Sequence, residues 1–296
     1  IKKLRPDMCI SNFGSTNVVT IVSYIMRVDN IINYVHTTTK QLKIDNKKNK
    51  LIAYLFQFRK VIIYHLMTFF LTNSQGNKKD ITEKYRIKES KVFVFPLLMA
   101  DSQRNIKSFD DRDFCITLVG RLHKSKGHKM LIRHFKYLIE YYPNLQLKII
   151  GDGYLKSELI KLTKKLDLEK NISFLGKIPN YEVSEIFSNS ILSISASQEE
   201  AFGLVNIEAL REGTPLLCSK TAGSKDIVTP KYNGLLYDIE DSVSFKNCFD
   251  EIFKNWKFYS ENARQSFKNK YSIYQADSQV NTLKKLIFSL SGRFTS

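Results

Sequence analysis

Short apolar runs alternate with helical patterns along most of this chain. Residues 114–120, 146–151 and 191–195 have the apolar character of buried strands. Between the first two runs, Leu131 and Phe135 recur at the spacing of an amphipathic helix. A strand that is repeatedly followed by a helix is typical of parallel α/β domains. We therefore predict an α/β protein with doubly wound, Rossmann-like sheets.

The length of 296 residues is about twice that of a typical domain, so we predict two domains. The first covers residues 1–100, a linker covers 101–113, and the second domain covers 114–270. A helical segment at 271–296 is expected to pack back on the first domain. Strands are expected at 7–11, 30–36, 67–73 and 91–96, and then at 114–120, 146–151, 172–175, 191–195 and 215–219. Helices are expected near 16–27, 48–64 and 78–85 in the first domain, and along most of the chain after residue 236.

The two predicted domains are unequal. The second has a full set of strands, whereas the first has four strands in about 96 residues and begins abruptly at Ile1. We therefore expect the start of the first domain to be missing from this chain.

The net charge indicates an anionic partner. Lysine and arginine exceed aspartate and glutamate by 46 to 29, a formal charge of +17, and the first hundred residues alone carry 17 against 6, or +11. Phosphorylated ligands, an anionic membrane surface and nucleic acid all fit this excess. The ordinary share of apolar residues, 43%, excludes a disordered or collagen-like chain.

The cysteines and the apolar stretches point to a cytoplasmic protein. The four cysteines are far apart and form no C-x-x-C pair, so the sequence suggests neither a zinc site nor a disulfide framework. The most apolar stretch, 51–71, is interrupted by Arg59 and Lys60, which favours a helix followed by a strand over a membrane span.

Two cations follow the first strand of the second domain. Gly120-Arg121-Leu122 ends this strand, and Lys126-Gly127 comes just before the next helix. Ligands of doubly wound sheets bind at the carboxyl ends of strands, often beside helix N-termini. Arg121 and Lys126 could hold two neighbouring phosphates there, or they could be solvated loop cations.

The segment around 200–208 combines two carboxylates with a helix start. We expect a helix to begin near Gly203, with Glu200 before it and Glu208 inside it. The free amides of Gly203, Leu204 and Val205 would point toward a phosphate. Each carboxylate could accept hydrogen bonds from sugar hydroxyls, which suits a sugar–diphosphate–ribose ligand. The alternative is an acidic loop followed by one solvated helical glutamate.

Other motifs are weaker. Gly151-Asp152-Gly153 is more typical of a plain strand-to-helix turn than of a dinucleotide fingerprint, and Asp111-Arg112-Asp113 lies in the expected linker, where a metal site is disfavoured. His36 ends a strand and could act as an acid–base or hydroxyl-positioning group, or be structural. The lysines before the amphipathic pattern at 51–62 could face anionic lipid or simply be solvated; they are Lys43, Lys47, Lys48 and Lys50.

Taken together, these motifs strongly resemble glycosyltransferase family 4, the retaining sugar-nucleotide transferases of GT-B fold. The resemblance is clearest over residues 116–237 and weaker over 1–100. Its motifs are Val119-Gly120-Arg121-Leu122 with Lys126-Gly127, Ile150-Gly151-Asp152-Gly153, Phe174-Leu175-Gly176, the E-x7-E element from Glu200 to Glu208, Gly213-Thr214-Pro215 and Ala222-Gly223. The chain departs from the family pattern at Ala201, where glycine is usual, and has no counterpart of the first strand and its glycine-rich loop.

The resemblance implies a role for each residue of the candidate site. Arg121 and Lys126 would bind the donor diphosphate, Glu200 the donor sugar and Glu208 the ribose. His36 would lie near the reacting sugar, and Lys177 and Ile178 would line the base pocket. The remaining donor-binding residues would be Gly120, Phe202, Gly203, Leu204 and Val205.

We therefore expect a retaining hexosyltransferase that uses a UDP-sugar, or alternatively a GDP-sugar, without a metal or other cofactor. The acceptor would be a glycan or a lipid-linked glycan in surface polysaccharide synthesis, which places the protein in the cytoplasm or on the inner face of the membrane. A catalytically silent GT-B subunit that binds nucleotide sugar or a partner enzyme is the alternative. Nucleic-acid binding rests on net charge alone, without a recognised module, and is not expected.

Overall fold

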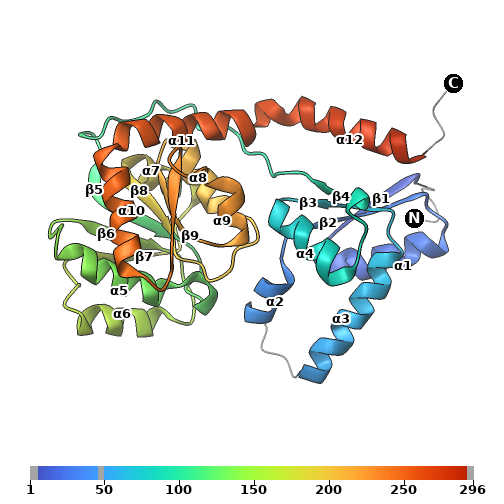
Figure 1. The fold of residues 1–296 in the computed structure, drawn as a ribbon, viewed down its shortest axis with the longest axis horizontal. Coiled ribbons are helices and arrows are strands. Elements are labelled where there is room, and N and C mark those ends of the chain that lie inside the picture. Colours follow the sequence, from blue (N-terminus) through green and yellow to red (C-terminus); the bar gives the residue numbers. More distant parts are fainter. Residues whose placement is uncertain (1–5, 46–49, 292–296) are drawn as a thin grey trace. The chain divides into compact units, whose positions relative to one another are not determined.

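The computed structural model describes residues 6–45 and 50–291, which form two compact units (Figure 1). The first unit comprises the chain up to residue 98 together with the stretch from 274, and the second comprises residues 99–273. Each unit contains one parallel β-sheet. The predicted α/β class with two parallel sheets is therefore confirmed.

The first sheet has its strands in chain order. These are β1 (Met8–Asn12), β2 (Asn30–Val35), β3 (Phe69–Thr72) and β4 (Val92–Val94), all parallel. The helices of this unit are α1 (Thr16–Ile25), α2 (Thr39–Asp45), α3 (Lys50–His65), α4 (Gln75–Tyr85) and α12 (Ala276–Ser291). All four predicted strands are present, whereas α2 was not predicted, because its sequence contains few apolar residues.

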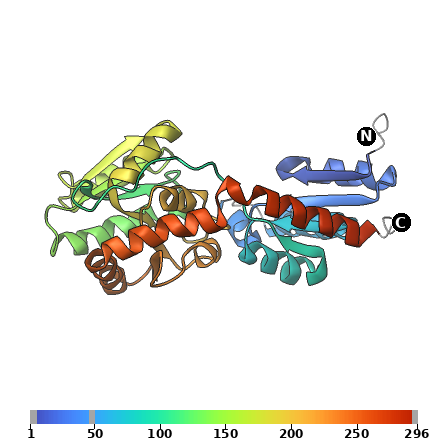
Figure 2. The ribbon, with the colours of Figure 1, turned by 90° about the horizontal axis from the view of Figure 1, so that it is seen from above.

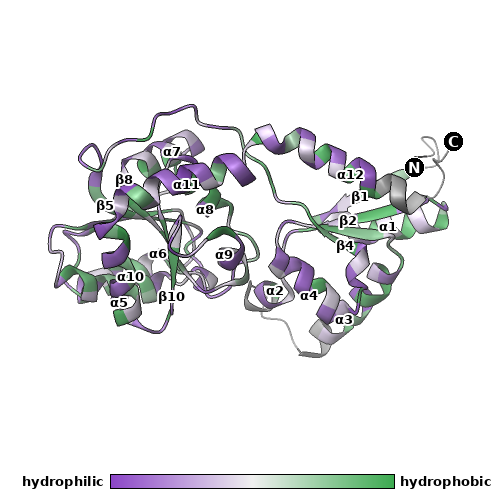
Figure 3. Ribbon diagram, turned by 45° about the horizontal axis from the view of Figure 1, so that its top comes forward, coloured by the Kyte–Doolittle hydropathy of each residue, from purple (hydrophilic) through white to green (hydrophobic). Residues whose placement is uncertain are grey.

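The alternation of side chains along β2 builds a core on each face of this sheet. Ile31 packs with Ile63 of α3 and Ile81 of α4 on one face. Its neighbour Ile32 faces the other way, and Leu283 and Leu286 of α12 pack against the cluster to which it belongs. Helix α12 lies along the first sheet in both views (Figures 1 and 2). The strands of this sheet are mainly hydrophobic, whereas α4 carries many hydrophilic residues (Figure 3).

The second sheet is doubly wound. Its order is β10 (Gly234–Tyr237), β9 (Leu216–Ser219), β8 (Ser190–Ser195), β5 (Asp113–Val119), β6 (Gln146–Ile150) and β7 (Ile172–Gly176). The chain winds outward from β5 to β7 and then crosses to β8 on the other side of β5, so the order reverses between β5 and β8. The five predicted strands are confirmed, and β10 adds a sixth that we did not predict. Such a reversal is where doubly wound sheets bind ligands.

Helices cover both faces of the second sheet. On one face, α5 (His128–Ile139) packs with α6 (Lys156–Lys165) and α10 (Ser242–Lys254). On the other, α8 (Leu204–Arg211) packs with α7 (Asn180–Asn189), α9 (Ala222–Ile227) and α11 (Trp256–Lys270).

No helix of the described residues is long and apolar enough to cross a membrane. The predicted lipid-facing lysines Lys43, Lys47, Lys48 and Lys50 lie outside the residues whose side chains the structure describes.

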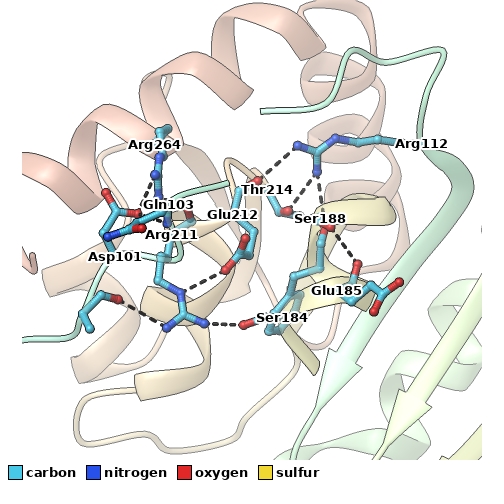
Figure 4. Close-up of polar contacts among 12 residues, drawn as sticks. Asp101, Gln103, Arg112, Ser184, Glu185, Ser188, Arg211, Glu212, Thr214 and Arg264 are labelled. Atoms are coloured by element: carbon cyan, nitrogen blue, oxygen red, sulfur yellow. Dashed lines mark hydrogen bonds and ion pairs between the residues drawn. The ribbon is translucent and has the colours of Figure 1, made fainter. Parts of the chain in front are cut away.

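The segment predicted as a linker, 101–113, lies within the second unit. Arg112 is buried there, and its guanidinium donates to the carbonyl oxygen of Ser190 (2.8 Å) and to Thr214 Oγ1 (3.0 Å) (Figure 4). It also donates to the carbonyls of residues 212 and 213 and lies 4.8 Å from the Trp256 ring centroid. Burial lowers its pKa to about 10.

Two further arginines attach the start of this segment to the helices. Arg264 of α11 donates to the Asp101 carboxylate (2.5 Å) and to the carbonyl of Arg211. Arg211 in turn donates to Glu212 Oε1 (2.9 Å) and to the hydroxyl of Ser184 on α7 (Figure 4). Residues 101–112 are therefore held against α7, α8 and α11 by charged hydrogen bonds.

We expect Arg112→Leu to lower the free energy of unfolding by about 3 kcal/mol, because buried carbonyl oxygens lose a charged donor. The matched control is Arg104→Leu, which removes an exposed arginine from the same segment and should change this free energy by less than about 0.5 kcal/mol. Urea unfolding followed by the fluorescence of Trp256, the single tryptophan, measures both. An equal decrease in the free energy of unfolding in both variants would show that the hydrogen bonds of Arg112 do not stabilise the second unit.

Candidate functional site

Three loops meet at the carboxyl ends of β5, β6 and β8. Gly127 has a φ of +67°, and a Cβ there would lie 1.7 Å from the carbonyl oxygen of Ala196. Gly151 has a φ of +131°, and a Cβ there would lie 2.0 Å from the carbonyl oxygen of Gly120. The amide of Gln198 donates to the Ser125 carbonyl (2.8 Å), which ties two of the loops together. These close backbone contacts are possible only with glycine.

Lys126 and Glu200 form an ion pair at this edge of the sheet. The stem of Lys126 lies over Gly120, since a Cβ at Gly120 would meet its Cγ and Cδ at 3.8 Å. The hydroxyl of Ser197 donates to the same Glu200 oxygen at 3.3 Å. The side chains of Lys126 and Glu200 are 21% and 14% exposed, so both remain reachable from solvent. The structure thus brings together two predicted site residues from different loops.

Helix α8 begins beside this ion pair. Gly203 precedes it with a φ of +95°, and no side chain among the described residues caps its N-terminus. A Cβ at Gly203 would lie 3.4 Å from Glu200 Cγ, so the glutamate runs next to the helix start. The predicted helix start near Gly203 is confirmed. The first amides of α8, at Leu204 and Val205, are therefore placed beside an ion pair at an N-terminus that favours anions.

Glu208 and Arg121 complete the polar side chains predicted for this site. Glu208 lies one turn into α8 and is half-buried; this burial raises its pKa, whereas the charge of Arg211 lowers it. Arg121 is exposed, and among the described residues no carboxylate pairs with its guanidinium. A glutamate in this setting can accept hydrogen bonds from hydroxyls, and an unpaired arginine can bind a phosphate.

The other predicted donor residues lie around the same edge. Lys177 and Ile178 follow β7, whose last residue accepts a hydrogen bond from Gly151 (2.7 Å); Lys177 is exposed and Ile178 half-buried. Phe202 is buried, and its ring packs against Tyr271 with a centroid distance of 6.3 Å. Phe202 therefore supports the loop that carries Glu200 by packing beneath it.

The segment at the start of α9 supports the loop that carries Glu200. The amide of Gly223 donates to the Glu200 carbonyl (2.7 Å), and a Cβ at Gly223 would lie 2.6 Å from the amide nitrogen of Phe202. Ser224 donates to the carbonyl of Ser219 (2.5 Å), and Ser219 donates to that of Ser197 (2.6 Å). The Ala222-Gly223 motif is therefore a support for the acidic loop.

His36 lies in the first unit, at the end of β2. Its Nε2 is 3.0 Å from Asn12 Oδ1, and its ring stacks on Phe13 with centroids 4.4 Å apart. Burial lowers its pKa, which favours the neutral imidazole. A neutral ring can both donate and accept a hydrogen bond, as an acid–base or hydroxyl-positioning group requires.

The acidic side chains of the D-x-D sequence are engaged by neighbouring residues. The carboxylate of Asp111 accepts from Ser108 (2.6 Å), that of Asp113 binds Lys148 (2.7 Å), and Arg112 is directed into the core. Within residues 6–45 and 50–291, no three His, Cys, Asp or Glu side chains are grouped so that they could hold a metal ion.

His128 is a feature of the site that sequence reasoning missed. It is the first residue of α5, it is 1% exposed, and neither ring nitrogen has a hydrogen-bond partner among the described residues. Burial, together with the charge of Lys126, lowers its pKa to about 4. Only its position directly after Lys126-Gly127 could have drawn attention to it.

We expect His128 to make the second unit less stable in acid. The imidazole takes up a proton near pH 6.5 when unfolded but only near pH 4 when folded, so the free energy of unfolding falls as the pH drops between these values. The full loss is about 3 kcal/mol. His128→Leu lacks this component, so the difference in unfolding free energy between the two proteins should change from pH 7.5 to pH 4.5. A pH-independent difference in urea unfolding would contradict the assignment.

Comparison with curated proteins finds glycosyltransferases. An uncharacterized glycosyltransferase of Methanocaldococcus jannaschii is 26% identical, with 83% of this chain and 62% of the relative covered. The N-acetylgalactosamine-N,N'-diacetylbacillosaminyl-diphospho-undecaprenol 4-alpha-N-acetylgalactosaminyltransferase of Campylobacter jejuni is 29% identical, with 79% and 62% covered. The chain thus spans about three fifths of the length of these relatives.

Solved structures of GT-B glycosyltransferases share the fold. Sucrose-phosphate synthase of Thermosynechococcus elongatus superposes with a TM-score of 0.79 at 19% identity, covering 97% of this chain and 75% of that one. HepE of Anabaena in complex with UDP superposes with a TM-score of 0.79 at 18% identity, covering 96% and 80%. The predicted GT-B architecture is therefore confirmed.

The family comparison covers most of the second unit. Residues 99–270, more than half of the chain, match the glycosyl transferases group 1. This stretch contains both loops that form the Lys126–Glu200 ion pair and the whole of α8. The chain belongs to the glycosyl transferases group 1 family.

Proposed function

We propose that this chain transfers a hexosyl group from a nucleotide-diphosphate sugar to a hydroxyl group, with retention of configuration. The observation that carries the proposal is the Lys126–Glu200 ion pair beside the uncapped start of α8, next to the exposed Arg121. Two cations and a helix N-terminus suit a diphosphate, and two carboxylates suit the hydroxyls at either end of the donor.

Departure of the nucleoside diphosphate creates negative charge on the β-phosphate. Arg121, Lys126 and the amides of Leu204 and Val205 would stabilise this charge from fixed positions, which is the main way that such sites lower a barrier. In the described structure Lys126 is paired with Glu200. When the donor binds, its diphosphate would share Lys126 with Glu200, and the carboxylate would then accept from a sugar hydroxyl.

The donor and acceptor classes extend this proposal. We infer a UDP-sugar as the preferred donor, with a GDP-sugar as the alternative, and solved relatives in complex with UDP and with UDP-glucose support this choice. Glu208 would bind the ribose, and Lys177 with Ile178 would line the base. An acceptor that is a glycan or a lipid-linked glycan of surface polysaccharide synthesis, handled in the cytoplasm or at the inner face of the membrane, agrees with the +11 charge of the first hundred residues.

We expect UDP to bind this chain and Glu208→Gln to weaken the binding about tenfold, or about 1.4 kcal/mol, because the variant keeps the shape but loses the charged acceptor. The matched control is Glu261→Gln on an exposed face of α11, which should leave the affinity unchanged. Calorimetric titration with UDP, GDP and ADP measures these affinities. If none of the three nucleotides binds, or if both variants bind as the unaltered chain does, the donor site is wrongly assigned.

Release of UDP from UDP-glucose distinguishes a transferase from a catalytically silent subunit. A transferase that binds UDP-glucose should slowly release UDP in the absence of an acceptor, and Lys126→Met should slow this release at saturating donor because the leaving group loses a cation. Tight binding of UDP-glucose without any release of UDP would favour the catalytically silent subunit.

A further inference from the structure

A cavity lies within the first unit, in the part of the protein that the donor chemistry does not use. Its volume is about 640 Å³. The start of α1, the end of β2, α2, α3 and the end of α4 contribute its lining. His36, the predicted residue beside the reacting sugar, is one of the lining side chains. The cavity is therefore built from several elements around a residue that the family resemblance assigns to the vicinity of the reacting sugar.

The described lining of the cavity carries positive charge and no carboxylate. Lys60 and Arg59 of α3 both line it, and none of its described lining residues is aspartate or glutamate. The Lys60 ammonium lies 5.1 Å from the ring centroid of Tyr64 and 5.0 Å from that of Tyr85. Arg59 lies 4.8 Å from the ring centroid of Phe56. These cations are thus held by aromatic rings, which position a charge without cancelling it.

The aromatic supports of Lys60 are rigid. Tyr64 and Tyr85 are only 2% and 3% exposed, and their own rings pack with centroids 4.8 Å apart. The Tyr85 hydroxyl is 3.1 Å from Thr39 Oγ1, which donates to the Asp80 carboxylate at 2.7 Å. Asp80 also accepts from the Thr39 amide (2.8 Å) and is not among the lining residues. Among the described residues, the carboxylate of Asp80 is therefore engaged by Thr39 and does not line the cavity with Lys60.

A lysine kept charged at neutral pH in a partly buried cavity calls for an anion. The hydroxyls of Thr37 and Tyr64, which also line the cavity, can donate further hydrogen bonds to phosphate oxygens. A volume of about 640 Å³ is several times that of a phosphate, so it also leaves space for the group to which the phosphate is attached.

We propose that this cavity binds the acceptor through a phosphate group, and that Lys60 is the residue that recognises it. The proposal rests on the transferase function proposed above, and it adds that the acceptor is a phosphate or diphosphate ester. The phosphate could belong to a soluble sugar phosphate or to the diphosphate end of a lipid-linked glycan; the chemistry at Lys60 is the same.

The test uses three probes: glucose 1-phosphate, inorganic pyrophosphate and farnesyl diphosphate in detergent. We expect at least one to bind, and Lys60→Met to weaken that binding at least tenfold, because methionine keeps the apolar stem but removes the charge. The matched control is Lys84→Met on an exposed face of α4, which changes the net charge equally and should leave the affinity unchanged. Tight binding of farnesyl diphosphate relative to pyrophosphate would identify a lipid source, and tight binding of glucose 1-phosphate a soluble one.

UDP affinity, measured on the same variants, distinguishes the failure of this inference from the failure of the proposed function. Lys60→Met should bind UDP as the unaltered chain does, which also shows that the variant is folded. If UDP binds but no phosphate probe does, or if Lys60→Met and Lys84→Met bind the probes equally, the phosphate cavity is overturned and the donor site stands. If the binding of a phosphate probe requires Lys60 but UDP does not bind, the phosphate site in the cavity is supported and the proposed function is contradicted.

Discussion

The candidate donor site depends on backbone contacts that no residue with a Cβ could make. The loop after β5 touches the loop after β8 where Gly127 meets Ala196, and it touches the loop after β6 where Gly151 meets Gly120. At both glycines φ is positive, so the conformation and the contact exclude other residues together. These contacts bring Lys126, in the loop after β5, close enough to Glu200, in the loop after β8, to form an ion pair. The glycines of the motifs are therefore the structural basis of the polar site.

Charge within the second unit is arranged in two different ways. Arg112 is enclosed by carbonyl oxygens and Trp256, so its charge is used entirely for packing the segment 101–112. Lys126 and Glu200, by contrast, stay partly exposed beside the uncapped start of α8. A fully enclosed guanidinium has no N–H group left to bind a ligand. In a partly exposed ion pair, by contrast, one of the two groups can be replaced by a group of the ligand. This difference separates the structural arginines from the residues that we assign to the donor.

The first unit shows a third arrangement, in which aromatic rings hold a cation. Lys60 lies against Tyr64 and Tyr85, while Asp80 is occupied by Thr39. A ring supplies attraction without a compensating negative charge, so the cavity keeps a positive potential. Together with His36 on the same cavity, this potential agrees with a role in holding an anionic substrate. The overall excess of basic residues toward the start of the chain has a local counterpart there.

The sequence by itself determined most of the order of strands and helices, because hydrophobic periodicity is a local signal. Nine strands and a helix start near Gly203 were predicted correctly. It missed α2 and β10, which are short segments. Only the tertiary structure decided the pairing of Lys126 with Glu200, which are 74 residues apart, and the burial of Arg112 and His128. Likewise, no local pattern could show that Lys60, Tyr85 and His36 line one cavity. Such relationships arise when separate loops and helices pack together, and spacing along the chain does not encode them.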